Sequence, residues 1–284
     1  MGTSFAAWHY VVRFYRKRKQ PPTKNEVYQL VDRFVSIFNA HGIERTQIPR
    51  FLGEQYLTLA DVSSDAKLLH ELNEAVLGAA CDRFGVQREW LDGKDAPIYP
   101  RLFFYKDMDR YIDFLSEVTS KYEDVSGFAF KSPEDDLKNS GKRFPIALIF
   151  RAVVGSLGEE PIYKYFIIGD EWPWEYPRTR IQFKAMVFAA FKFKAYIMAY
   201  DLPEDEINRL LWGQTFPGPV LDNLHHVTWH PDDYVFTSDE SSVAKDPEEA
   251  AELRKLIKQS EWVKKLEAAT GPITENLTHF KIIE

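Results

Sequence analysis

Residues 43–93 constrain the fold of this chain more than any other stretch, because they end in a dense apolar pattern. Apolar residues recur there at helical spacing and lead into the tripeptide Phe84-Gly85-Val86. They are Leu68, Leu69, Leu72, Val76, Leu77 and Ala80. This spacing predicts one amphipathic helix that ends in a corner, with Trp90 and Leu91 closing a small helical core.

A second helical pattern precedes this stretch. Thr23 and Glu26 stand at the spacing of a capping box, which is typical of a helix start. Val27, Leu30, Val31, Phe34 and Phe38 then recur on one face. We expect this helix to end at Gly42, because glycine adopts the left-handed conformation that closes a helix without steric cost.

Two short helices are predicted between these patterns. Thr46 is placed to cap a helix over residues 47–52, and Gly53 supplies the turn after it. Thr58, with Asp61 three residues later, then marks the start of a helix that runs through Asp65.

Two helices joined by a turn and followed by Phe84-Gly85-Val86 and Trp90-Leu91-Asp92-Gly93 resemble the lambda-repressor-like helix-turn-helix family, whose members commonly end on such a corner. That family binds double-stranded DNA and usually regulates transcription. The resemblance covers about a quarter of the chain, and it implies that the helix from Thr58 enters the major groove. The basic and polar residues available for phosphates or base edges are Arg45, Thr46, Gln47, Arg50, Gln55 and Thr58.

The predicted recognition helix departs from a typical DNA-reading surface. It carries Asp61 and Asp65 among apolar and serine residues, and the two carboxylates would face phosphates. An alternative is therefore a protein-interaction module with a degenerate helix-turn-helix that no longer reads DNA. A negative surface over these two aspartates favours the alternative, and a continuous positive surface with Arg45 and Arg50 favours DNA.

Charge is distributed unevenly along the 284 residues, whose formal net charge is -7. Residues 1–50 hold nine Lys or Arg against three Asp or Glu, and residues 51–100 hold four against nine. Residues 1–22 form a basic tail that ends at Pro21-Pro22. Such a tail can be solvated, lie along DNA as an arm, or contact an anionic membrane surface.

The prolines in residues 96–100 predict a linker, so we place a helical domain at 23–95 and an α+β domain at 101–284. Two β-rich runs, 145–154 and 162–168, predict an antiparallel hairpin. The polar stretch 131–143 predicts a loop. Helices are predicted over 108–118, 178–200, 202–213 and from 246 to about 270.

Two segments of the second domain contain groups that carry chemistry elsewhere. Residues 170–177 combine carboxylates with two tryptophans, a pairing found in glycosidases. His225, His226 and His230 precede Asp232 and Asp233, and imidazoles and carboxylates can bind metals. We favour structural roles for both segments, since the tryptophans fit a core and the histidine spacing matches no metal motif. No enzymatic activity, cofactor or metal is expected.

The cysteine content and the absence of long apolar runs indicate the compartment in which we expect this chain. Cys81 is the single cysteine, so an internal disulfide is excluded, and its apolar surroundings predict a packing role. No apolar run approaches about 18 residues, and the basic residues of the tail follow its apolar part, the reverse of a secretory signal. We therefore expect a cytoplasmic α+β protein without a membrane partner. It would be a two-domain regulator whose second domain senses a ligand, forms a homodimer or recruits a partner.

Overall fold

A β-hairpin forms the centre of the sheet. β3 (Ala147–Leu157) and β4 (Glu160–Ile168) run antiparallel, and Gly158 in the turn between them has a φ of +71°. The sequence predicted this hairpin, and it is confirmed. The computed structural model describes residues 24–135, 137, 145–170, 172–235 and 247–273.

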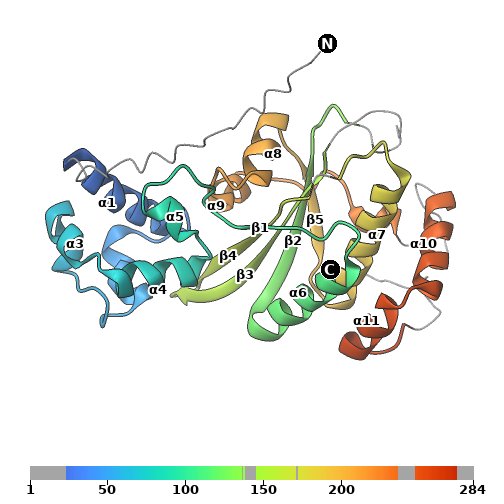
Figure 1. Ribbon diagram of the computed structural model, residues 1–284, viewed down its shortest axis with the longest axis horizontal. Helices are drawn as coiled ribbons and strands as arrows, with labels where there is room; N and C mark the ends of the chain where they lie inside the picture. Colours follow the sequence, from blue (N-terminus) through green and yellow to red (C-terminus); the bar gives the residue numbers. More distant parts are fainter. Residues whose placement is uncertain (1–23, 136, 138–144, 171, 236–246, 274–284) are drawn as a thin grey trace, which may run out of the picture.

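Three more strands complete a mixed sheet of five strands in the described residues, in the order β1-β4-β3-β2-β5 (Figure 1). β2 (Glu123–Lys131) lies antiparallel to β3, and β5 (Ile197–Asp201) lies parallel to β2. The two-residue β1 (Arg101–Leu102) lies parallel to β4. The chain is therefore α+β, as predicted.

The two faces of the sheet bury alternate side chains, as the period of two in a strand requires. From β3, Leu148 and Phe150 join the core on one face, and Ala147 and Ile149 join the core on the other. All four side chains are fully buried. Helices cover both faces, so the molecule has three layers, helices, sheet and helices (Figure 1).

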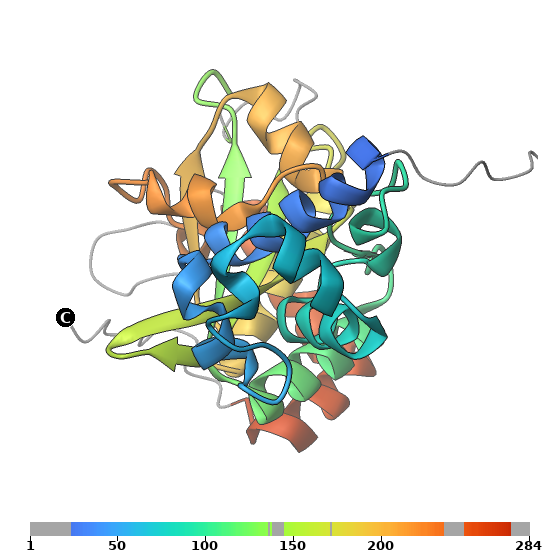
Figure 2. The same ribbon diagram turned by 90° about the vertical axis from the view of Figure 1, so that its left-hand side faces the viewer.

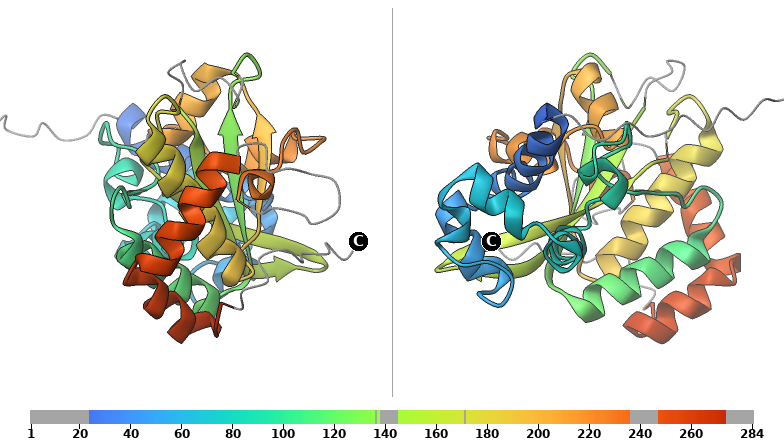
Figure 3. Two further views of the ribbon diagram at one scale, coloured as in Figure 1. Left: turned by 90° about the vertical axis from the view of Figure 1, so that its right-hand side faces the viewer. Right: turned by 60° about the vertical axis from the view of Figure 1, so that its left-hand side comes forward.

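One helical layer is formed by α6 (Met108–Lys121), α7 (Pro177–Lys192), α10 (Pro247–Gln259) and α11 (Trp262–Thr270). α10 and α11 come to the front in the left panel of Figure 3. The helix predicted over 108–118 is confirmed. The single helix predicted from 246 to about 270 is wrong, because the chain turns near Ser260, so that α10 packs on α7 and α11 packs on α6.

The opposite layer is formed mainly by the N-terminal part of the chain. Its helices are α1 (Lys24–Asn39), α2 (Ile48–Leu52), α3 (Asp65–Glu71), α4 (Glu74–Phe84), α5 (Arg88–Leu91), α8 (Glu204–Leu211) and α9 (Pro217–Asp222). Figure 2 shows them in front of the sheet. α1 is confirmed, with Gly42 at a φ of +74° shortly after its end, and α8 is confirmed, with Gly213 just beyond it. α9 was not predicted.

The predicted helix over 178–200 is half right. α7 ends at Lys192, and the backbone then closes the helix with Lys194 at a φ of +60° and a hydrogen bond from the Ala195 N–H to the Ala190 carbonyl. β5 follows at once. Apolar residues alternate through the whole run 181–197, which is a strand pattern. The run was too long for one strand, and it was therefore predicted as a helix.

Segment 96–100, predicted as a linker, is packed into the fold. Ile98 and Tyr99 are buried, and the Gln87 side chain donates hydrogen bonds to the carbonyls of Pro97 and Tyr99 at 3.0 and 3.1 Å. Side chains of α1 and α4, such as Phe38 and Phe84, lie in one core with the sheet. The domain boundary at this segment stays a prediction, but the apolar core is continuous across it.

Candidate nucleic-acid interface

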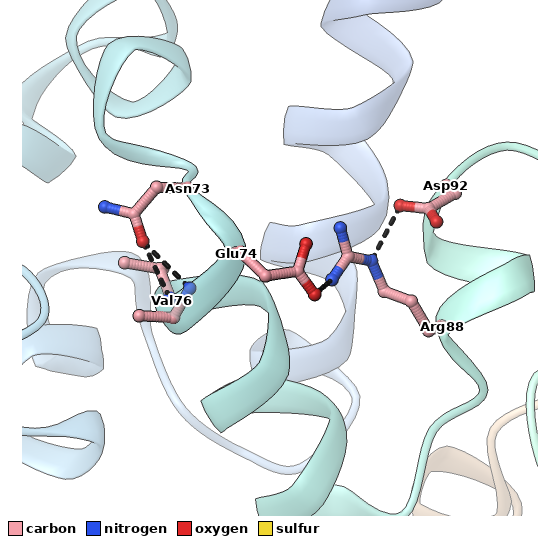
Figure 4. Close-up of polar contacts among 6 residues, drawn as sticks. Asn73, Glu74, Val76, Arg88 and Asp92 are labelled. Atoms are coloured by element: carbon pink, nitrogen blue, oxygen red, sulfur yellow. Dashed lines mark hydrogen bonds and ion pairs between the residues drawn. The ribbon is translucent and has the colours of Figure 1, made fainter.

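The corner after α4 has the compact form that the sequence predicted. Phe84 and Leu91 are fully buried. Arg88 donates one hydrogen bond to Glu74 at the start of α4 and another to Asp92 after α5, at 2.6 and 2.7 Å (Figure 4). The pair with Glu74 joins α4 to α5 on the solvent side, and the pair with Asp92 lies within the α5 segment.

A single helix from Leu68 to Ala80 was predicted, and this is wrong. Asn73 interrupts it, and its side-chain oxygen accepts hydrogen bonds from the N–H groups of Ala75 and Val76 (Figure 4). Asparagine is a preferred helix cap for this reason. The apolar spacing continues across the break, so periodicity alone does not reveal it.

The predicted recognition helix from Thr58 to Asp65 is absent. Residues Asp61–Ser63 form one 3₁₀ turn, and α3 begins only at Asp65, capped by Ser64. The Asp61 carboxylate accepts hydrogen bonds from the hydroxyl and the N–H of Thr58, both at 2.7 Å. Serine and aspartate side chains here hydrogen-bond the nearby backbone, which favours caps and turns over a continuous helix.

Those two hydrogen bonds from Thr58, the hydroxyl first and the backbone N–H second, lower the pKa of Asp61 below its ordinary value. Asp61 is therefore negative at neutral pH. It stands at the start of the segment that the resemblance would place against DNA, where a negative charge repels phosphate.

The six predicted contact residues lie close together in the chain, but half of them are engaged within the protein. Arg45 donates a hydrogen bond to the Val62 carbonyl at 2.7 Å and forms an ion pair with Asp65 at 2.6 Å. The Gln47 side chain accepts a hydrogen bond from the Glu44 N–H.

That last bond corrects a second prediction. Glu44 and Gln47 form the capping box of a 3₁₀ turn (Arg45–Gln47) that leads into α2, so Thr46 is not the helix cap. Thr46, Arg50 and Gln55 are exposed. Of the two predicted arginines, Arg50 is the one for which no hydrogen bond, ion pair or ring contact is found among the described residues.

Leu59 is a surface feature that sequence reasoning missed. It lies between α2 and α3, and 65% of its surface is exposed, the largest fraction among the exposed large apolar residues of the described chain. Glu54 and Asp61 flank it in sequence. The position was predicted to lie in a helix, where a leucine is usually buried, so the sequence pattern gave no sign of its exposure.

The acidic and aromatic segment has a structural role. Trp172 and Trp174 are buried in the core, and Asp170 accepts a hydrogen bond from the Phe104 N–H at 2.5 Å. Burial raises the pKa of this carboxyl, while the hydrogen bonds from the backbone of Phe104 and Tyr105 and the charge of Arg101 act in the opposite direction. Its carboxylate holds the loop before α6.

The histidine segment does not form a metal site in the described part of the chain. His225, His226 and His230 are exposed. Across residues 24–135, 137, 145–170, 172–235 and 247–273, no group of three or more His, Cys, Asp or Glu side chains is placed to hold a metal ion. Trp229 is buried and lies beside Ala199 of β5, so this segment serves packing.

Comparisons with known proteins identify no relative. No family model matches the chain, and neither a curated protein nor a solved structure matches it. Within the described residues, the helices are too short or too polar to cross a membrane.

Proposed function

We propose that the unit formed by α1–α5 is a protein-interaction module, a degenerate helix-turn-helix that binds a basic, partly apolar segment of a partner protein and does not read DNA. The observation that carries this proposal is the ion pair between Arg45 and Asp65. It removes the best-placed arginine from contact with phosphate, and the aspartate it engages is on the segment expected to read bases.

The charge of the helical unit supports the same proposal. Residues 24–95 hold eight Lys or Arg and twelve Asp or Glu, a formal charge of -4. Most of the arginines are engaged: Arg33 lies over the Trp90 ring at 5.3 Å, Arg83 lies over Phe51 at 5.5 Å, and Arg88 forms the ion pairs of the corner. Duplex binding depends on several cations that meet phosphates at once.

The surface around Leu59 indicates the chemistry of the partner. An exposed leucine with acidic neighbours fits an apolar side chain that is flanked by Lys or Arg. Glu54 is exposed on one side in sequence, and Asp61 keeps its negative charge on the other. The contact would combine burial of Leu59 with attraction at its rim.

A binding titration tests the proposal with the full chain. The probe is a labelled amphipathic helical peptide with leucine at positions i, i+3, i+4 and i+7 and lysine at most other positions, and its control replaces each lysine with glutamate. We expect the lysine peptide to bind, Leu59→Ser and Glu54→Lys to weaken binding about tenfold each, and the glutamate peptide not to bind. Asp82→Lys on α4 makes the same change of charge at another exposed site and should leave the affinity unchanged.

Equal affinity in Leu59→Ser, Glu54→Lys and Asp82→Lys would show only general attraction to an acidic protein and would refute the proposal. A duplex titration is the second arm. The proposal is contradicted if the chain binds duplex DNA with an affinity that falls as the salt concentration rises and that is weaker in Arg50→Ala.

DNA binding is the second candidate function, and one observation favours it. Residues 1–23 hold five Lys or Arg and no Asp or Glu, and they join directly to α1. Together with the exposed Arg50, this basic segment would supply phosphate contacts without reading sequence. A gel shift of the full chain at two salt concentrations tests it, with removal of residues 1–22 and Arg50→Ala as variants. Loss of a salt-dependent shift in both variants would establish this candidate over the first.

A further inference from the structure

The sheet has a notch where β5 is shorter than its neighbour β2. β5 begins at Ile197 and pairs with β2 only from Gly127 onward, so residues 123–126 of β2 have no strand on that side. A groove of about 810 Å³ lies there, between the start of β2 and the connection from α7 to β5. This volume is within the range of sites for small molecules.

We propose that this groove binds a small aromatic carboxylate, with the carboxylate on Arg151 and Lys194 and the ring against Tyr163 and Tyr196. The groove is formed by the sheet, the end of α6 and the connection from α7 to β5, so it is separate from the partner surface on α1–α5.

The guanidinium of Arg151 is held in a fixed position that leaves it able to bind an anion. Its guanidinium lies 4.1 Å from the centre of the Tyr163 ring and 4.9 Å from that of Phe128, and its Nε donates a hydrogen bond to the Ser126 hydroxyl at 3.2 Å. Among the described residues, no carboxylate lies within ion-pair distance of it. The two terminal nitrogens of a guanidinium match the two oxygens of a carboxylate, and fixing the group beforehand lowers the entropy lost on binding.

Lys194 supplies a second cation to the lining of the groove. Its backbone has a φ of +60°, in the position after α7 where glycine is usually found. A lysine therefore strains this turn, and its side chain is exposed beside the groove. Asp124 in β2, at a φ of +47°, lines the same groove in a similar conformation. Side chains that cost backbone stability often mark binding sites.

The remaining lining selects the class of ligand. Tyr196 is 54% exposed, and with Tyr163 and Phe193 it offers aromatic surface for a planar ring. Glu123 and Asp124 also line the groove, so its four charged side chains sum to zero. This balance disfavours a polyphosphate, because the two cations could not match its several negative charges.

Isothermal titration of the full chain with 4-hydroxybenzoate tests the proposal. Binding is expected for this probe and not for its neutral amide, for ATP or for cyclohexanecarboxylate. Arg151→Gln should weaken binding by about tenfold or more, because a charge-assisted, two-point contact is lost. Arg178→Gln, an exposed arginine that does not line this groove, is the matched control and should bind as the wild type does.

Lys194→Gly keeps the test valid if Arg151→Gln fails to fold. This variant should raise the melting temperature, because glycine relieves the strain at this φ, and yet it should weaken binding. The proposal is overturned if 4-hydroxybenzoate does not bind at millimolar concentration, if its neutral amide binds equally well, or if Lys194→Gly binds with wild-type affinity.

Discussion

His41 should make the stability of this protein depend on pH between about 6.5 and about 4. The ring is buried between α1 and the sheet, 4.2 Å from the centre of Phe84 and 5.4 Å from that of Tyr165. Burial lowers its pKa from 6.5 to about 4, and only the hydrogen bond to the Ile37 carbonyl, at 2.6 Å, acts in the opposite direction.

The sign follows from the order of protonation. The unfolded chain takes up a proton on this histidine near pH 6.5, and the folded chain takes it up only near pH 4. Stability is therefore complete at neutral pH and falls as the pH drops through this window. A lowering of this size corresponds to about 3 kcal/mol in all, and about 2.5 kcal/mol is lost by pH 4.5.

Urea unfolding at pH 7.0, 6.0, 5.0 and 4.5 measures this effect. The comparison is with His41→Phe, Tyr99→Phe, a double variant that fills the same space and removes the Tyr99 hydroxyl, which lies 3.3 Å from the His41 ring. Burial raises the pKa of Asp170 and Asp232, so both carboxyls act in the opposite direction, but they do so equally in both proteins. The wild type should lose about 2.5 kcal/mol more than the variant by pH 4.5.

Parallel curves for the two proteins would refute this reasoning. That result would mean that the folded protein takes up the proton on this imidazole at no cost in stability, for example by a small shift that exposes the ring to water. A larger loss in the variant would likewise contradict it.

Three further predictions concern single residues. Burial raises the pKa of Cys81 to about 11, so alkylation by iodoacetamide at pH 8 should be about a hundred times slower than that of an ordinary thiol, and mass spectrometry over time measures it. Gly218→Ala should destabilise the fold by more than about 2 kcal/mol in urea unfolding, because the added carbon would lie 2.3 Å from the Ala40 carbonyl oxygen. Arg45→Ala should cost about 1 kcal/mol and speed hydrogen exchange at the start of α3, since it frees Asp65 and the Val62 carbonyl; unchanged exchange would contradict the role of that ion pair.

Local patterns in the sequence predicted the elements that depend on local physics. α1, α6 and α8 have apolar stripes of helical period, and the β3–β4 hairpin has β-rich runs on both sides of a turn. The class of fold followed from these elements.

Elements that depend on distant partners were missed. β2 carries two exposed acidic residues at its start, and it becomes a strand because β3 and β5 pair with it on both sides. β5 was assigned to a helix for the same reason, since its partner strand is more than 60 residues away. No local pattern reveals such pairing.

The candidate site was predicted as a set of positions and not as a set of contacts. Arg45 and Asp65 were both singled out, but their ion pair depends on the turn at Asp61–Ser63, where a helix was expected. The groove beside β2 was missed completely. The features that point to it are the stacking of Arg151 on two rings and the left-handed backbone of Lys194. Neither feature can be inferred from the sequence.

The apolar core that runs from α1 and α4 into the sheet limits how this protein can respond to a partner. Separating the N-terminal helices from the sheet would expose to water both Phe38 and the face of β3 that carries Ile149. The helices of residues 24–95 are therefore fixed to the sheet by this shared core. A partner of these helices must therefore bind on their solvent-exposed side while they stay packed on the sheet. A fragment that ends at residue 95 should fold poorly and aggregate.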